Sequence, residues 1–136
     1  MNRPILLCYQ LLTGLSDTST GVLLIVAPVL TLRLMRLHVP SDALPFLSFI
    51  GAFVLSVGLS CLYGALLIAR GAYAQRLEVI WLLTAFTRSG VAIFVVTQIL
   101  AGTLEAGWLP VALTDGTCVL IQAIGLRKGW LRNGAK

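Results

Sequence analysis

Charged residues are scarce in this sequence. Only 11% of the 136 residues are charged, whereas 58% are hydrophobic, and soluble domains carry about 25% charged residues. A soluble chain with this composition could not cover its surface with polar groups. Lipid or a partner protein must therefore surround it, and its length allows a single domain, residues 1–136.

Histidine and clustered cysteines are also lacking, which limits the chemistry. His38 is the sole histidine and lies in a predicted loop, and Cys8, Cys61 and Cys118 stand in three separate apolar segments without CxxC spacing. Metal centres and histidine-based catalysis need such groups close together. We therefore expect no metal, no cofactor and no enzymatic activity, and we expect the cysteines to be small buried hydrophobic residues.

Long apolar segments predict the fold. Four of them cover residues 5–32, 45–69, 77–101 and 109–126, and an α-helix crosses the hydrocarbon of a bilayer in about 20 residues. Barrel strands would alternate in character and be about ten residues long. Because the connections are short, consecutive helices should be antiparallel neighbours. The sequence predicts an all-α integral membrane bundle of four antiparallel transmembrane helices, with a kink or an early helix end at Pro28.

The distribution of basic residues predicts the orientation of these helices. One side of the membrane would hold Arg33 and Arg36, with Glu105 in a connection that has no basic residue. The other side would hold the seven residues Arg3, Arg70, Arg76, Arg127, Lys128, Arg132 and Lys136. The positive-inside rule then places both termini in the cytoplasm, as in a multi-pass protein of a cell inner membrane. Basic residues spread in this way do not predict a nucleic-acid partner.

Two spacing patterns predict contacts of the helices. Tryptophans near segment ends are typical of anchors at the membrane surface, and they are Trp81, Trp108 and Trp130. Small residues that recur every four positions lie on one helix face, and they are Ser48, Ala52, Ser56, Ser60 and Gly64. Such a stripe allows close helix packing. We expect it inside the bundle, and a homo-oligomer interface is the alternative.

Three ionisable residues, Asp17, Arg88 and Asp115, fall inside the predicted spans. Exposure of each to lipid costs roughly 2.5–3.5 kcal/mol on insertion scales, so all three should face the interior. At 1.5 Å per residue, each lies roughly 16–18 Å from the cytoplasmic boundary. A guanidinium can serve two carboxylates at once. We predict a buried Asp–Arg–Asp polar core and candidate ligand site, whose polar neighbours include Thr18, Thr84 and Gln122.

The role of this core stays open between two interpretations. It could be a structural lock that sets helix register, or a site for a small ligand, since intramembrane charges are functional candidates. The first hypothesis is a non-enzymatic membrane protein that acts as an accessory or assembly subunit or binds a small ligand, in contact with the lipid bilayer and with a protein partner or a second copy. A small transporter or channel that uses the same core is the alternative. A membrane enzyme or redox subunit is the weakest of the three hypotheses.

Short glycine-containing motifs give the sequence a family resemblance. They are Leu12-Thr13-Gly14-Leu15 with Gly21, Phe49-Ile50-Gly51-Ala52-Phe53 with Gly58, and Leu83-Thr84-Ala85-Phe86-Thr87-Arg88. In these motifs the chain resembles the small DoxX-like four-helix membrane proteins. The resemblance implies a compact bundle with a buried arginine, and some proteins of this kind resemble accessory subunits of quinone-linked oxidoreductases. It assigns no catalytic residue.

Overall fold

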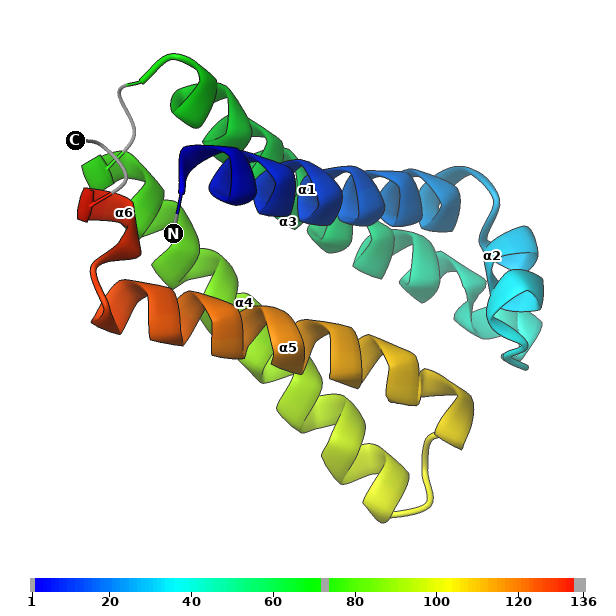
Figure 1. Ribbon diagram of the computed structural model, residues 1–136. Helices are drawn as coiled ribbons and strands as arrows, with labels where there is room; N and C mark the ends of the chain where they lie inside the picture. The colour runs from blue at the N-terminus through cyan, green and yellow to red at the C-terminus, as the bar shows by residue number, and fades with distance from the viewer. Residues whose placement is uncertain (1, 72–73, 134–136) are drawn as a thin grey trace. The chain divides into compact units, whose positions relative to one another are not determined.

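The computed structural model describes residues 2–71 and 74–133, and helices dominate this part of the chain (Figure 1). Lys136 lies outside the described residues, as does the side chain of Arg132. The described residues contain no strand, which confirms the all-α class. The helices are α1 (Arg3–Val26), α2 (Pro28–Met35), α3 (Leu44–Ala69), α4 (Ala74–Leu100), α5 (Leu109–Arg127) and α6 (Trp130–Asn133), with short 3-10 turns η1 (Ser41–Ala43) and η2 (Ala106–Trp108).

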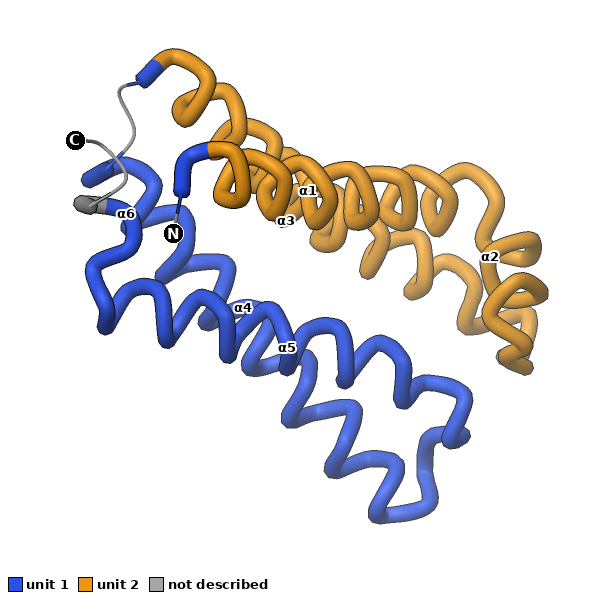
Figure 2. Tube along the Cα trace, viewed as in Figure 1, with its two compact units in different colours: residues 1–3, 71–136 blue, residues 4–70 orange. Residues whose placement is uncertain are grey.

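The helices divide into two compact units, which Figure 2 shows in different colours. One unit comprises residues 4–70 and holds nearly all of α1 together with α2 and α3. The other comprises residues 1–3 and 71–136 and holds α4, α5 and α6. Each unit is built on an antiparallel pair of long helices, so each has its own seam between helices.

Three helical stretches are long and apolar enough to cross a membrane: Ser41–Ala69, Ala74–Leu100 and Ala106–Arg127. Large hydrophobic side chains are exposed along them, among them Phe46 and Phe86, both 69% exposed. Exposed apolar surface of this extent fits lipid better than water. The structure thus supports a helical membrane protein. The predicted fourth span, residues 5–32, is not among the three, because a polar stretch around Asp17 lowers the mean hydropathy of α1.

The first predicted span consists of two helices. Helix α1 ends at Val26, Ala27 adopts a non-helical conformation (φ −140°, ψ 59°), and α2 begins at Pro28. Proline has no backbone N–H and a φ fixed near −65°, so it suits the first position of a new helix. The early helix end that the sequence predicted at Pro28 is therefore present, and α2 continues to Met35, beyond the predicted limit at residue 32.

Glycines make the seam between α1 and α3. A Cβ atom on Gly21 would lie 2.5 Å from the backbone N of Leu55, and one on Gly58 would lie 2.5 Å from the backbone N of Thr18. The two backbones are thus in direct contact at these points, as small residues allow in membrane helices.

This seam includes only part of the predicted small-residue stripe. Ser48 of that stripe reaches α1, where its hydroxyl donates to the carbonyl of Leu24 at 3.2 Å, and Gly64 is buried, whereas Ala52 and Ser56 are exposed. Four residues turn an α-helix by about 400°, so each step of such a stripe moves about 40° around the helix. The contact with α1 instead follows the face that Gly51 and Gly58, seven residues apart, share.

Trp81 belongs to the core of the α4–α5 unit, which corrects its predicted role as an anchor at the membrane surface. Its side chain is 0% exposed. The Cζ3 atom of its ring lies 2.5 Å from the position that a Cβ on Gly125 would occupy. The missing side chain at Gly125 leaves room for the indole between α4 and α5. Trp108 and Trp130, in contrast, are only half-buried and lie next to helix ends.

Candidate functional site

A buried ion pair joins α4 to α5. The Nη1 atom of Arg88 donates to Oδ1 of Asp115 at 2.6 Å, and the two side chains are 4% and 15% exposed. Hydrogen bonds between charged groups are shorter and stronger than those between neutral groups. Both residues lie within stretches that are long and apolar enough to cross a membrane. Two formal charges are thus held together between two largely apolar helices.

A neutral polar pair lies next to the ion pair in sequence. The Nε2 atom of Gln122 donates to Oγ1 of Thr84 at 2.9 Å, and both side chains are buried. Thr84 precedes Arg88 by four residues and Gln122 follows Asp115 by seven, so in antiparallel helices the two pairs share one face of each helix. We call Arg88, Asp115, Thr84 and Gln122 the polar ladder.

The other threonines near these residues do not join the polar ladder. Thr87, Thr114 and Thr117 are exposed, and each hydroxyl donates to a carbonyl of its own helix at 2.7–3.1 Å. A threonine that returns its hydroxyl to the backbone four residues earlier needs no further partner. The sequence of this region therefore contains more polar residues than the buried site does.

Two predicted members of the core, Asp17 and Thr18, belong to the α1–α3 unit. Asp17 is half-buried in α1. Thr18 packs against Gly58 of α3, and its buried Oγ1 makes no hydrogen bond among the described residues. Arg88 and Asp115 lie in the other unit. The approach of Asp17 to the ion pair stays a prediction.

The α1–α3 unit also buries a polar residue that the sequence analysis did not single out. Gln10 is fully buried, and its Nε2 donates to the carbonyl oxygen of Cys61 at 3.4 Å. Its position, four residues before Gly14 on the glycine-bearing face of α1, was a usable signal. A polar side chain on the same helix face as packing glycines faces the neighbouring helix rather than lipid.

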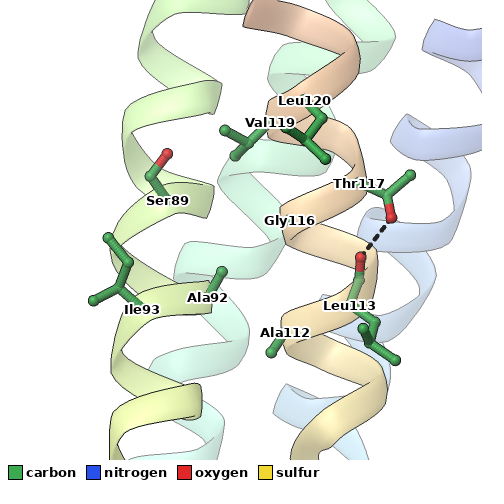
Figure 3. Close-up of a pocket in the computed structure, with 9 residues that line it drawn as sticks. All are labelled: Ser89, Ala92, Ile93, Ala112, Leu113, Gly116, Thr117, Val119 and Leu120. Carbon is green, nitrogen blue, oxygen red and sulfur yellow. Dashed lines mark hydrogen bonds between the residues drawn. The ribbon is translucent and has the colours of Figure 1, made fainter.

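An apolar groove runs between α4 and α5, with a volume of about 460 Å³ (Figure 3). Small and aliphatic side chains line it, among them Ala92, Ala112 and Leu120, beside Gly116. Thr117 also lines it, but its hydroxyl donates to the carbonyl of Leu113 (Figure 3). None of the polar-ladder residues is among the lining residues. The groove and the polar ladder are therefore separate features of this unit.

The polar ladder can recognise a molecule through charge and hydrogen bonding. In the described part of the chain, no group of three His, Cys, Asp or Glu residues is arranged to hold a metal ion. The polar ladder offers a guanidinium, a carboxylate, a hydroxyl and an amide, all on rigid helices. Such groups can hold and orient a small polar molecule.

The motifs that resemble DoxX-like proteins have clear structural roles. Gly21 and Gly58 bring α1 and α3 together, and Arg88 ends the third motif and forms the buried ion pair. The resemblance itself stays a prediction. No protein-family model, no curated protein and no solved structure matches this chain.

Proposed function

We propose that this chain is a multi-pass inner-membrane protein without enzymatic activity, which binds a small polar ligand at its buried core and serves as an accessory or assembly subunit of a membrane complex. The observation that carries the proposal is the Arg88–Asp115 pair, buried within apolar helices. Asp17 is the proposed second carboxylate of this core. As the resemblance to DoxX-like proteins implies, the core would be a buried arginine inside a compact helix bundle.

A purely stabilising role explains the ion pair poorly. Replacing a buried ion pair by apolar side chains of similar volume is often neutral or stabilising, because desolvation offsets the attraction. The α4–α5 unit already has an apolar core that includes Leu77, Trp81 and Cys118. Ionisable residues inside membrane spans are rare and mark sites of binding or transport. A ligand site therefore accounts for the charges better than stability does.

The proposed fourth crossing is α1. Its 24 residues would extend about 36 Å at 1.5 Å per residue, which exceeds the roughly 30 Å of hydrocarbon. Asp17 and its hydroxyl neighbours are the reason for its low hydropathy, and close packing on α3 would shield that polar face from lipid. Four crossings place both termini on the same side of the membrane.

The proposed orientation rests mainly on the α4–α5 unit. Its one end carries Arg76, Arg127 and Lys128, all exposed, whereas the connection over residues 101–108 has no basic residue. Helices α1 to α3 give no clear bias, because Arg3 at the start of α1 and Arg70 at the end of α3 are matched by Arg33 and Arg36. The positive-inside rule then places the basic end of α4–α5 in the cytoplasm.

Reporter fusions test this topology. Alkaline phosphatase fused after Thr103 should be active, because it would reach the periplasm, and the same enzyme fused after Gly71 should be inactive. Green fluorescent protein should fluoresce at the C-terminus, and an N-terminal epitope tag should be accessible only in inside-out vesicles. An inactive fusion at Thr103 would reverse the orientation. An N-terminal tag accessible from the periplasm would remove α1 as a crossing.

Co-purification tests the ligand site. The protein should be extracted in polymer nanodiscs, and native mass spectrometry should detect a bound small molecule or partner protein. The matched control is Arg88→Leu/Asp115→Leu, which removes both charges and keeps the helices apolar. We expect the bound species with wild type and its loss, by at least tenfold, with the double variant. Identical spectra for the two proteins would refute the proposal.

Transport through the core is the second candidate function. It is favoured by the extent of the polar ladder, because Thr84 and Gln122 lie on the side of the ion pair toward the start of α4 and the end of α5, where the basic residues are. Ionisable residues inside membrane spans mark substrate and ion pathways in transporters. Flux of protons or small ions into proteoliposomes that is lost in Arg88→Leu/Asp115→Leu would favour transport over binding alone.

A further inference from the structure

The amide of Gln122 has a defined orientation, which is set by Thr84. The hydroxyl of Thr84 donates to the carbonyl of Ile80 at 2.8 Å, so its single proton is already engaged. Its oxygen can then only accept, and it accepts from Nε2 of Gln122 at 2.9 Å. The amide oxygen of Gln122 consequently points away from Thr84.

This amide oxygen is an unused acceptor. Gln122 is 1% exposed, and its Oε1 makes no hydrogen bond among the described residues. A buried acceptor without a partner costs about 1–3 kcal/mol relative to one that is satisfied, and such groups are rare enough in native proteins to require a specific explanation. A leucine of similar length would avoid this cost. The glutamine therefore supplies something that apolar packing does not need.

We propose that Oε1 of Gln122 accepts a hydrogen bond from a neutral hydroxyl group bound at the polar ladder. This inference rests on the proposed function and names the chemistry of its ligand. An acceptor requires a donor, and the neutral donor that we propose is an O–H, as in water or an alcohol. Within this unit the charge of Arg88 is balanced by Asp115, so the polar ladder has no excess positive charge with which to hold an anion.

Two sources can supply such a hydroxyl. One is an internal water molecule, since buried waters typically make about three hydrogen bonds to polar groups that lack partners. The other is an organic hydroxyl, such as that of a quinol or of a lipid glycerol. Both present the same O–H donor to Gln122, and they differ in exchange with solvent and in mass.

Solid-state NMR on the wild-type protein in bilayers distinguishes these sources. The chain has only four glutamines, Gln10, Gln75, Gln98 and Gln122, so labelling the glutamine side chains gives a simple spectrum. Loss of one signal in Gln122→Leu assigns the Gln122 amide. Magnetisation transfer from water to that amide would identify water as the donor. Mass spectrometry of the solvent extract would identify an organic hydroxyl compound that is present with wild type and depleted at least tenfold with Gln122→Leu.

Thermal unfolding gives an independent readout, with Thr117→Val as the matched control. If a donor is bound, Gln122→Leu loses a satisfied hydrogen bond, and its midpoint temperature should fall by about 2–4 °C or more. If no donor is bound, the same variant removes an unsatisfied acceptor but also the bond from Nε2 to Thr84; these effects oppose each other, and the midpoint should stay within about 1 °C of wild type or rise. Thr117→Val should leave the midpoint within about 1 °C of wild type.

The outcomes separate this inference from the proposed function. A water or an organic hydroxyl at Gln122, together with a lower midpoint for Gln122→Leu, supports the inference. Absence of both donors, or an unchanged or higher midpoint for Gln122→Leu, overturns it. Water as the donor would support the inference even where the co-purification experiment refutes the proposed function, because that experiment depends on Arg88 and Asp115 and on an organic ligand or partner.

Discussion

Replacing either Arg88 or Asp115 by leucine should lower the free energy of unfolding by about 3–5 kcal/mol, because each change leaves one buried charge without its partner. The Arg88 side chain is 4% exposed, and its Nη1 lies 2.6 Å from Oδ1 of Asp115. The remaining charge would therefore be buried away from water without a partner, which costs free energy. Unfolding of the purified protein in mixed micelles, followed by circular dichroism during titration with sodium dodecyl sulfate, measures the loss.

The double variant Arg88→Leu/Asp115→Leu should recover most of this loss. It leaves neither charge of the pair, and apolar side chains of similar volume replace both. The control is Thr117→Val, whose exposed hydroxyl bonds only its own helix and whose change should stay within about 0.5 kcal/mol. Single variants as stable as the control would show that the ion pair is open to water and is not buried in the membrane.

The proposed place of Asp17 in the core has a direct consequence in the same experiment. If Asp17 shares Arg88 with Asp115, the double variant keeps one buried carboxylate without a cation. Recovery would then require the triple variant with Asp17→Asn. Full recovery in the double variant, with no further gain from Asp17→Asn, would place Asp17 outside the core.

Alanine at Gly21 or Gly58 should be the most disruptive change in the α1–α3 unit. The added Cβ would lie 2.5 Å from a backbone nitrogen of the opposite helix, Leu55 for Gly21 and Thr18 for Gly58. Backbone atoms cannot move aside as a flexible side chain can, so the helices must separate along the seam. We expect a loss of about 1–3 kcal/mol or more, which is typical of overpacked cores. The same detergent titration measures it.

Gly90→Ala and Gly116→Ala are the matched controls for this prediction. A Cβ at either position meets no atom within 4 Å, and both glycines lie inside long helices. Alanine has a higher helix propensity than glycine by about 1 kcal/mol, so these variants should be neutral or slightly more stable. Equal effects at Gly58 and Gly90 would contradict the close approach of α1 and α3.

Much of the architecture follows from local properties of the chain. Long apolar runs must satisfy every backbone hydrogen bond internally in lipid, and a helix does so within one segment. That is why the limits of α3, α4 and α5 could be predicted to within a few residues, and why Pro28 could be predicted to end α1. Helix α1 is the exception, because Asp17 and its hydroxyl neighbours make its sequence ambiguous between a crossing and a polar buried helix.

The ion pair could also be anticipated in part. The intramembrane depth of Arg88 and Asp115 follows from counting residues along two antiparallel helices, and a buried charge requires a partner. Which threonines join the site could not be read from the sequence. Thr84 and Thr87 have the same chemistry and differ only in the helix face that they occupy, so Thr84 is buried beside Gln122 whereas Thr87 is exposed.

The sequence by itself determined that this chain is helical, apolar enough for a membrane and equipped with charges at matched depth, because these properties depend on composition and spacing alone. Only the tertiary structure decided that Gly51 and Gly58 form the seam with α1, that Trp81 fills the space over Gly125, and that Gln122 carries an unused amide oxygen. These features depend on the rotation of one helix against another. That rotation is set by the fit of side chains across the interface, which no single helix encodes.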